Sequence, residues 1–430
     1  MKISVIGTGY VGLCTGVGFA IKGHDVICVD IDKKKINMIN AGKSPIYEPL
    51  LDEYLARVIK QNKFQATTDL DYAIKNTDVS FISVGTPSRP DGSMDTKYIA
   101  QASESIGKIF KKKKSYHVVV VKSTVLPGTT ENVAKKNIEK FSGKKAGRDF
   151  GIAMNPEFLR EGKALEDFLN PDRVVIGGID KKSSDTIEKL YAKFDAPVVK
   201  TNIKTAEMIK YVSNAFLATK ISLINEVGNM CKELGINTYD VAKGVGYDKR
   251  IGDKFLNAGI GYGGSCFPKD VKALISKARE MGYKARLLED VISVNEDQPF
   301  RVIAVLKKHV PVLRGKKIAL LGLAFKSDTD DIREAPAIKI IDRLLKEKAV
   351  ITAYDPKAAE NMKALFPKIR YAKSSREAIK GADVCLVLTE WDEFKKLTDR
   401  DFSQMKSNII IEGRRILDDK KVKRFEGVCW

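Results

Sequence analysis

Short apolar runs alternate with longer amphipathic stretches through the first part of the chain. The runs KISVI, DVICVD, VSFISV, YHVVVV and FGIAM are separated by helical stretches and glycine turns. This alternation is typical of a parallel sheet whose strands are joined by crossover helices. It predicts an α/β fold.

A single long helix is predicted over residues 205–234, because its helical pattern contains no proline and Gly235 follows it. Helical sequence then continues to about residue 309, interrupted by a glycine-rich loop. After Pro311 the strand–helix alternation returns and repeats the beginning of the chain. KKIALLGLAF resembles MKISVIGTGY, VITAYDP resembles VICVDID, and AIKGADVCLVLT matches AIKNTDVSFISVGT in order and spacing.

The repeat predicts two Rossmann-like domains with parallel sheets, joined by a long central helix and a helical connector domain. We expect an N-terminal dinucleotide-binding domain at 1–200, a central helical domain at 201–310 and a C-terminal Rossmann-like domain at 311–430. The second copy has GLAFKSD where the first has GTGYVG. It should therefore bind something other than a second dinucleotide, or bind a nucleotide differently.

Composition narrows the class of protein. The 430 residues carry a net charge of +20, but the lysines are scattered and no nucleic-acid motif occurs, so an anionic small substrate fits this charge better than nucleic acid does. No apolar run is long enough to span a bilayer, and the strand pattern starts at the first residues, so we expect a cytoplasmic protein without a membrane partner. None of the six cysteines lies in a CxxC pair or at metal spacing from a histidine, and we expect no metal site. Four of them fall in apolar strands or helices and are expected to be packing residues: Cys14, Cys28, Cys231 and Cys385.

The first strand is followed by a G-x-G-x-x-G fingerprint made of Gly7, Gly9 and Gly12. In this context the backbone N–H groups and the helix N-terminus are available to a pyrophosphate. Asp30 closes the next strand, where a carboxylate accepts hydrogen bonds from ribose hydroxyls and repels a 2′-phosphate. NAD is therefore favoured over NADP, although the lysines at 33–35 weaken that preference.

Other strand ends and loops carry further candidate residues. Thr86 with Pro87, and Ser123 with Thr124, follow strands whose carboxyl ends should line the cofactor cleft, unless they serve only as turn residues. If NPEFLREGKAL is helical, Glu157 and Glu161 share one face, where they either activate water or face solvent. Lys210 and Asn214 are likewise four residues apart on the long helix. A cation and an amide pointing the same way stabilise an oxyanion, and a surface pair is the alternative.

The loop GIGYGGSCFPKD contains Cys266, with glycines before it and Pro268 after it. Glycines let the backbone approach a ligand closely, and Lys269 lies near enough in sequence to favour a thiolate. Such a thiol is suited to covalent catalysis, and an inert buried thiol is the alternative.

The motifs GTGYVG, VGTP, KSTVLPGT, NPEFLREGKA, KYVSNAF, GIGYGGSCFPKD and GLAFKSDTDDIRE together resemble the UDP-glucose/GDP-mannose dehydrogenase family along the whole chain. The resemblance implies an NAD-dependent, four-electron oxidation of a sugar C6 alcohol to a carboxylate, with two NAD molecules used in succession. Phe267 stands where GDP-mannose enzymes tend to have leucine, so the resemblance favours UDP-glucose as substrate and UDP-glucuronate as product. Cys266 corresponds to the nucleophile that forms a thiohemiacetal and then a thioester.

The resemblance also implies roles for other residues. Lys210 and Asn214 match residues that stabilise the C6 oxygen, Asp270 matches a carboxylate that helps in proton transfer, and Glu157 and Thr124 match residues tied to the hydrolytic water. The cofactor-binding residues that it implies are Gly7, Gly9, Tyr10, Val11, Gly12, Asp30, Lys35, Thr86, Pro87, Ser123, Thr124, Glu161 and Arg333. The substrate-binding residues that it implies are Glu157, Phe158, Leu159, Lys210, Asn214, Arg250, Phe255, Asn257, Tyr262, Gly263 and Lys326.

A homodimer is expected, because the long apolar-striped helix has a face to bury and Arg250 matches an arginine that reaches across a dimer interface. Two other functions remain open. A single-step hydroxyacid or phosphogluconate-type dehydrogenase shares the Lys-x-x-x-Asn spacing but has no use for the cysteine loop. A non-catalytic nucleotide-sugar or NAD sensor would not need Cys266.

Overall fold

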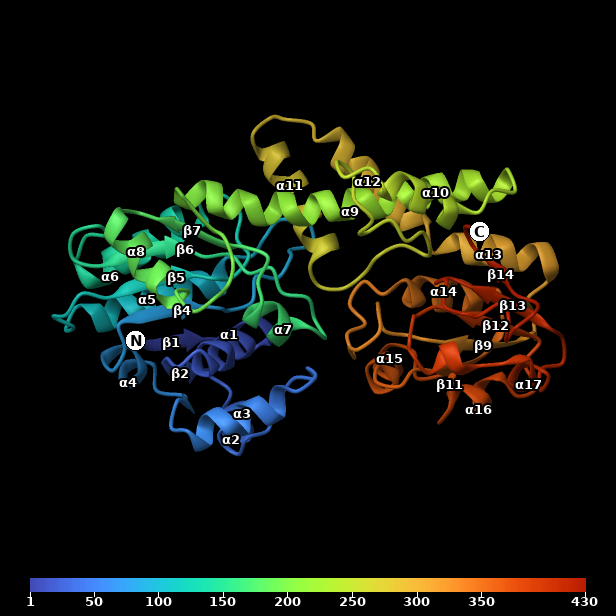
Figure 1. The fold of residues 1–430 in the computed structure, drawn as a ribbon, viewed down its shortest axis with the longest axis horizontal. Coiled ribbons are helices and arrows are strands. Elements are labelled where there is room, and N and C mark those ends of the chain that lie inside the picture. Colours follow the sequence, from blue (N-terminus) through green and yellow to red (C-terminus); the bar gives the residue numbers. More distant parts are fainter. The chain divides into compact units, whose positions relative to one another are not determined.

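The computed structural model describes residues 1–430, which divide into two compact units, Met1–Ser213 and Asn214–Trp430. The first unit contains an eight-stranded sheet with strand order β3-β2-β1-β4-β5-β6-β7-β8 (Figure 1). Its strands are β1 (Lys2–Ile6), β2 (Asp25–Val29), β3 (Phe64–Thr67), β4 (Val79–Ile82), β5 (Val118–Val121), β6 (Gly151–Met154), β7 (Val174–Gly178) and β8 (Val198–Thr201). Neighbouring strands are parallel except β6 and β7, which pair antiparallel.

Helices join the strands of this sheet and cover it. They are α1 (Tyr10–Ile21), α2 (Lys33–Asn40), α3 (Leu51–Lys60), α4 (Leu70–Lys75), α5 (Lys97–Phe110), the π-helical turn η1 (Thr130–Lys135), α6 (Lys136–Ser142), α7 (Ala164–Leu169) and α8 (Lys181–Leu190). Phe19 of α1 is fully buried and makes edge contacts with Phe168 and Tyr191. The core of the unit therefore contains side chains from α1, from α7, which precedes β7, and from α8, which follows it.

The predicted long helix is α9 (Ile203–Glu233), which is 31 residues long and ends before Gly235, a residue with a φ of +69°. In the second unit α9 is followed by α10 (Thr238–Gly246), α11 (Phe267–Glu280), α12 (Arg286–Asp297) and α13 (Phe300–His309). The prediction of one long helix followed by shorter helices is confirmed.

The second sheet is six-stranded and parallel throughout, with the order β11-β10-β9-β12-β13-β14. Its strands are β9 (Lys317–Leu321), β10 (Val350–Tyr354), β11 (Arg370–Tyr371), β12 (Val384–Val387), β13 (Ile409–Glu412) and β14 (Glu426–Gly427). Its helices are α14 (Pro336–Lys346), α15 (Ala359–Leu365), α16 (Ser375–Ile379), η2 (Phe394–Lys396) and α17 (Asp399–Phe402). The order β10-β9-β12 repeats β2-β1-β4, which confirms the internal repeat. The three-domain division at residues 200 and 310 stays a prediction.

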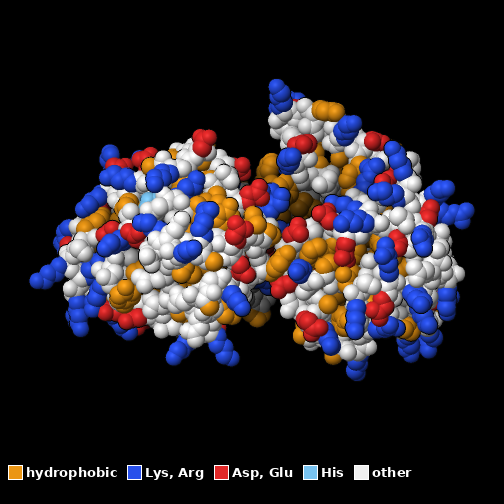
Figure 2. All heavy atoms as spheres, turned by 60° about the horizontal axis from the view of Figure 1, so that its bottom comes forward, with side chains coloured by type: hydrophobic (Ala, Val, Ile, Leu, Met, Phe, Trp, Pro, Cys, Tyr) orange, Lys and Arg blue, Asp and Glu red, His pale blue; other side chains and the backbone are white.

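The distribution of surface charge and the burial of four cysteines agree with the expectations from the sequence. On the face shown in Figure 2, Lys and Arg side chains are interspersed with Asp and Glu. None of the helices combines the length and apolarity that crossing a membrane requires. Cys14, Cys28, Cys231 and Cys385 are buried, as packing residues should be, and Cys266 is half-buried.

Candidate active site

Each glycine of the fingerprint has its own steric role in the turn between β1 and α1. Gly7 has a φ of +99°, and a Cβ on Gly12 would lie 1.9 Å from the Gly7 carbonyl oxygen. A Cβ on Gly9 would meet nothing within 4 Å, and no side chain caps the N-terminus of α1. The backbone at Gly9 is therefore open to a ligand, and the free N–H groups of the first turn suit a pyrophosphate. These residues therefore fit NAD.

Asp30 follows β2 beside this turn. Its carboxylate accepts hydrogen bonds from the Thr8 N–H at 2.9 Å, the Thr8 hydroxyl at 2.7 Å and the Asp32 N–H at 3.0 Å. Partial burial raises the pKa of Asp30, but the bonds from Thr8 and Asp32 outweigh burial and hold the pKa below its usual value. The carboxylate is thus ionised and oriented, as reading a ribose requires.

Asp355 occupies the corresponding place in the second sheet, directly after β10. It is buried, and five groups donate to it at 2.7–3.1 Å: the N–H groups of Leu323, Ala324, Lys357 and Ala358 and the indole of Trp391. A carboxylate with so many donors has no capacity left for ribose hydroxyls. This agrees with the expectation that the second copy does not repeat the dinucleotide site.

The loops after β4 and β5 are held together by their hydroxyl groups. Ser123 donates to the carbonyl oxygen of Val84 at 2.7 Å, and Thr86 donates to the carbonyl oxygen of Thr124 at 3.0 Å. Both serine and threonine thus shape the strand ends by bonding to backbone.

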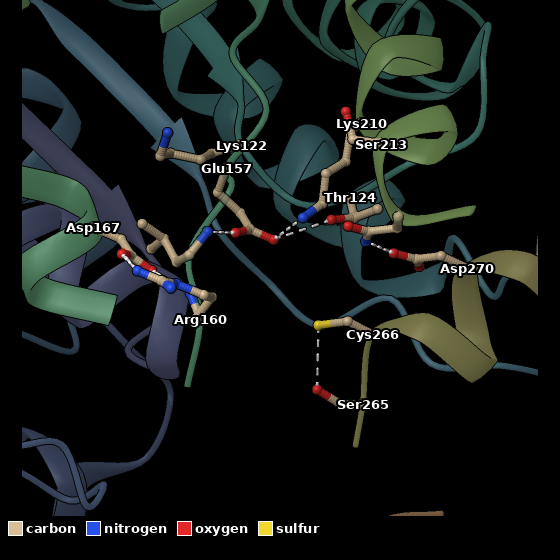
Figure 3. Close-up of polar contacts among 12 residues, drawn as sticks. Lys122, Thr124, Glu157, Arg160, Asp167, Lys210, Ser213, Ser265, Cys266 and Asp270 are labelled. Carbon is tan, nitrogen blue, oxygen red and sulfur yellow. Dashed lines mark hydrogen bonds and ion pairs between the residues drawn. The ribbon is translucent and has the colours of Figure 1, made fainter. Parts of the chain in front are cut away.

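A buried ion pair joins the loop after β6 to α9. The Lys210 ammonium lies 3.0 Å from Glu157 Oε1, and neither side chain is more than 5% exposed. The Thr124 hydroxyl donates to the same oxygen at 3.4 Å, and the Leu159 N–H donates to Oε2 at 2.6 Å (Figure 3). Burial raises the pKa of Glu157, but the Lys210 ammonium and the Leu159 N–H together keep the pKa below its usual value. The site therefore holds an ionised carboxylate beside a cation and a hydroxyl.

The condition that NPEFLREGKAL is helical is not met over its first nine residues, because α7 begins only at Ala164. The Glu157 carboxylate takes the Leu159 N–H, and the Gly162 N–H donates to Glu48 at 2.9 Å, so these backbone donors are used outside any helix. Glu157 and Glu161 consequently do not share a helix face.

Lys210 and Asn214 lie one turn apart on α9, and both are buried. Asn214 Nδ2 donates to Asp270 Oδ2 at 2.6 Å, and Asp270 is 1% exposed. The amide is therefore tied to the carboxylate that follows the cysteine loop. The surface-pair alternative for these two residues is wrong.

Cys266 precedes the first turn of α11, in which Pro268 takes an N-terminal position. Its carbonyl oxygen accepts the Asp270 N–H at 2.9 Å, and its Sγ lies 3.6 Å from the Ser265 hydroxyl. The ammonium of Lys269, the residue expected to favour a thiolate, lies 2.5 Å from Asp270 Oδ1. The positive end of the α11 dipole acts on the thiol from the helix N-terminus.

Buried amides hold the glycine-rich loop that leads to this cysteine. Asn225 accepts the Gly259 N–H at 2.8 Å, and Gln298 donates to the Gly259 carbonyl oxygen at 2.7 Å. Asn295 pairs with both backbone groups of Tyr262, at 2.8 and 3.0 Å. Sequence reasoning missed these three residues. Only Asn225 carries a signal in the sequence, because it is a carboxamide that follows Leu223 and Ile224 within the predicted long helix.

The other predicted binding residues lie outside the contacts described so far. Arg250 is exposed and pairs with Asp248 at 2.6 Å, and Arg333 pairs with Asp331 at 2.7 Å. Phe255 has a φ of +64°, a strained value for a bulky residue. The remaining predicted residues lie in the first turns of α1 and α2, in the loops after β4 and β6, in the cysteine loop and after β9: Tyr10, Val11, Lys35, Pro87, Phe158, Asn257, Gly263 and Lys326.

Comparisons with known proteins agree with this geometry. The chain matches the UDP-glucose/GDP-mannose dehydrogenase family in its NAD binding domain at residues 1–195, its central domain at 204–297 and its UDP binding domain at 319–419. It is 46% identical to a UDP-glucose 6-dehydrogenase of Haloferax volcanii, with both chains covered completely. It is 44% identical to one of Bacillus subtilis, over 96% of this chain and 93% of that protein.

Solved structures point the same way. A UDP-glucose dehydrogenase from Pyrobaculum islandicum superposes with a TM-score of 0.94 at 39% identity, covering 100% of this chain and 97% of that one. A UDP-D-ManNAc dehydrogenase from Pyrococcus horikoshii superposes with a TM-score of 0.87 at 30% identity, covering 100% and 99%. The chain therefore belongs to the UDP-glucose/GDP-mannose dehydrogenase family and is an NAD-dependent enzyme.

Proposed function

We propose that the protein oxidises UDP-glucose twice at C6 and releases UDP-glucuronate, with Cys266 as the covalent nucleophile. The observation that carries the proposal is the place of Cys266 at the N-terminus of α11, one turn before the buried Asp270. The 44–46% sequence identity to UDP-glucose 6-dehydrogenases, over 96–100% of this chain, supports the choice of sugar nucleotide. NAD, when bound, accepts one hydride, so two molecules are used for each sugar.

The first oxidation needs a base and a stabilised oxygen. Asp270 takes the hydroxyl proton as the hydride leaves C6, and an aldehyde forms. The Cys266 thiolate then adds to the aldehyde carbon, and the oxyanion of the resulting thiohemiacetal is stabilised by the Lys210 ammonium and the Asn214 amide. The covalent bond retains the intermediate, and the carbon keeps a C–H bond for the second oxidation.

The second hydride leaves from the same carbon, and the oxyanion becomes the carbonyl of a thioester. Water then attacks this carbonyl, the C–S bond breaks, and the Cys266 thiolate leaves. We assign activation of the water to Glu157, whose ionised carboxylate takes a proton, and its positioning to Thr124. The C-terminal Rossmann-like domain holds the UDP group, whose binding energy positions C6.

We further propose a homodimer in which Arg250 reaches the sugar nucleotide bound to the partner subunit. The apolar stripe of α9 would be buried between the subunits. Six free cysteines fit a reducing compartment, and we assign the reaction to the cytoplasm.

The test is the stoichiometry of NADH formed for each UDP-glucose consumed. The proposal expects two, and a value of one would favour a single-step dehydrogenase. Cys266→Ala should abolish UDP-glucuronate formation, whereas the matched variant Cys231→Ala, at a buried helical thiol, should keep it. A protein whose function survives Cys266→Ala would instead fit a sensor. Parallel assays with GDP-mannose and UDP-N-acetyl sugars test the choice of sugar.

A further inference from the structure

Lys122 is a buried lysine that no role proposed above uses. It follows β5 directly and is 3% exposed. Its ammonium donates to Asn155 Oδ1 at 3.1 Å, to the Asn155 carbonyl oxygen at 3.4 Å and to the Tyr191 hydroxyl at 3.4 Å, and the Phe168 ring centroid lies 5.9 Å away. All of these partners are neutral, so the charge is buried without an ion pair.

The hydrogen-bond network around this ammonium does not need it. Asn155 Oδ1 also accepts the Tyr191 hydroxyl at 2.6 Å, and Asn155 Nδ2 donates to the Val175 carbonyl oxygen at 2.7 Å. Both ends of the amide stay satisfied if Lys122 is removed. A buried charge without a carboxylate partner is costly to the fold, so its presence calls for another explanation.

The position of Lys122 in the fold explains why a charge is buried there. β5 and β6 are parallel neighbours in which Val121 lies opposite Met154. Beyond the strand ends the same register continues, because Lys122 contacts Asn155 and, two residues later, Thr124 contacts Glu157. Lys122 therefore lies immediately behind the cluster of Thr124, Glu157 and Lys210 (Figure 3).

The charges in this interior act on one another. Burial lowers the pKa of Lys122 to about 8, the Glu157 carboxylate opposes that shift, and the Lys210 ammonium adds to it. In return, Lys122 is one of the cations that lower the pKa of Glu157. The charged groups that act on Lys122 are thus Glu157 from the loop after β6 and Lys210 from α9, and the Tyr191 hydroxyl, which directly follows α8, contacts its ammonium.

We propose that Lys122 is a positioning residue of the reaction, whose positive charge keeps Glu157 ionised so that it can activate the hydrolytic water. The role acts through Glu157 and rests on the function proposed above. It accounts for a buried ammonium that the surrounding hydrogen bonds do not require.

The test compares Lys122→Met, which keeps the volume and removes the charge, with Lys113→Met. Lys113 is a matched control, because it is a partly buried lysine of the same unit that donates to the Ile74 and Thr77 carbonyl oxygens and burial lowers its pKa too. For Lys122→Met we expect the KM values for UDP-glucose and NAD to stay near those of the wild type. The acidic limb of the kcat–pH profile should move to higher pH by roughly half a unit to one unit, because Glu157 loses a nearby cation. Lys113→Met should leave the profile in place.

Lys122→Gln, which keeps a donor for Asn155 without the charge, should shift the profile as Lys122→Met does. A profile that stays in place in both variants overturns the proposal. Failure of both variants to fold also overturns it, since the residue would then serve the fold. If the wild type forms only one NADH per UDP-glucose, the proposed function fails separately, whatever the Lys122 variants show.

Discussion

The Lys210 ammonium and the Glu157 carboxylate form an ion pair of 3.0 Å that is almost wholly withdrawn from water. In such surroundings each charge depends on the other, because neither is solvated well enough to be stable alone. The pair also connects α9 with the loop after β6, so a change in either residue acts on both the fold and the proposed chemistry.

Lys210→Met should destabilise the protein by about 3–5 kcal/mol at neutral pH, because it leaves the Glu157 carboxylate buried and unpaired. The double variant Lys210→Met/Glu157→Gln should recover much of that loss, since neither position then carries a charge that has lost its ion-pair partner. Urea unfolding of the two single variants, the double variant and the wild type measures this coupling. Additive effects of the two substitutions would contradict it. Neither single variant nor the double variant should keep wild-type kcat.

Gly9→Ala and Gly12→Ala separate cofactor binding from folding. The new Cβ at position 9 enters open space, so stability should be unchanged while the KM for NAD rises by about tenfold or more, since the methyl group occupies the space that the pyrophosphate needs. The new Cβ at position 12 collides with the Gly7 carbonyl oxygen, so stability should fall by about 1–3 kcal/mol. Thermal unfolding and NAD titration check both. A Gly9→Ala protein that binds NAD normally would argue against the assigned site.

Glu207 predicts a pH dependence of stability. It is fully buried on α9, accepts the N–H groups of Gly128 and Thr130 at 2.6 and 2.8 Å, and forms no ion pair. Burial raises the pKa of Glu207 to about 7. Between the unfolded pKa of about 4.5 and this value the folded state binds more protons, so this group makes stability fall as pH rises through that window.

The measurement is the free energy of unfolding at several pH values between 4.5 and 8, for the wild type and for Glu207→Gln. The free energy of unfolding of the wild type, relative to that of Glu207→Gln, should fall as pH rises, by up to about 3 kcal/mol. The comparison of slopes is unaffected by a constant loss from the lost acceptor. Parallel curves for the two proteins would show that Glu207 does not titrate in this range.

The exposed stripe of α9 predicts a dimer. Phe216, Leu223 and Met230 follow one another at seven-residue intervals, which places them on one helix face, and they are 66%, 57% and 55% exposed. Phe216→Glu should shift the dimer to monomer in light scattering, because it places a charge in an apolar contact. Lys204→Glu, on the same helix but outside this seven-residue stripe, is the control that changes charge without removing apolar area. A monomeric wild type would contradict both the dimer and the role proposed for Arg250.

Features set by a few neighbouring residues were readable from the sequence. The glycine fingerprint, Asp30 after β2, the length of α9 and the internal repeat depend on local sterics and periodicity, and each is found where it was expected. The antiparallel pairing of β7 with β6 was not predicted, because strand direction depends on the path of the chain between them. Whether Glu157 lies on a helix could not be decided from the sequence, and it does not, because the carboxylates of Glu157 and Glu48 accept the N–H groups of Leu159 and Gly162.

By itself, then, the sequence determined the α/β elements, the position of the glycine fingerprint and the family to which the chain belongs. Only the tertiary structure decided which charged groups pair: Glu157 with Lys210, and Asp270 with Lys269. The physical reason is that backbone preferences act within a few residues, whereas burial and ion pairing arise between residues that folding brings together from distant parts of the chain. The ionisation of this site is therefore a property of the fold.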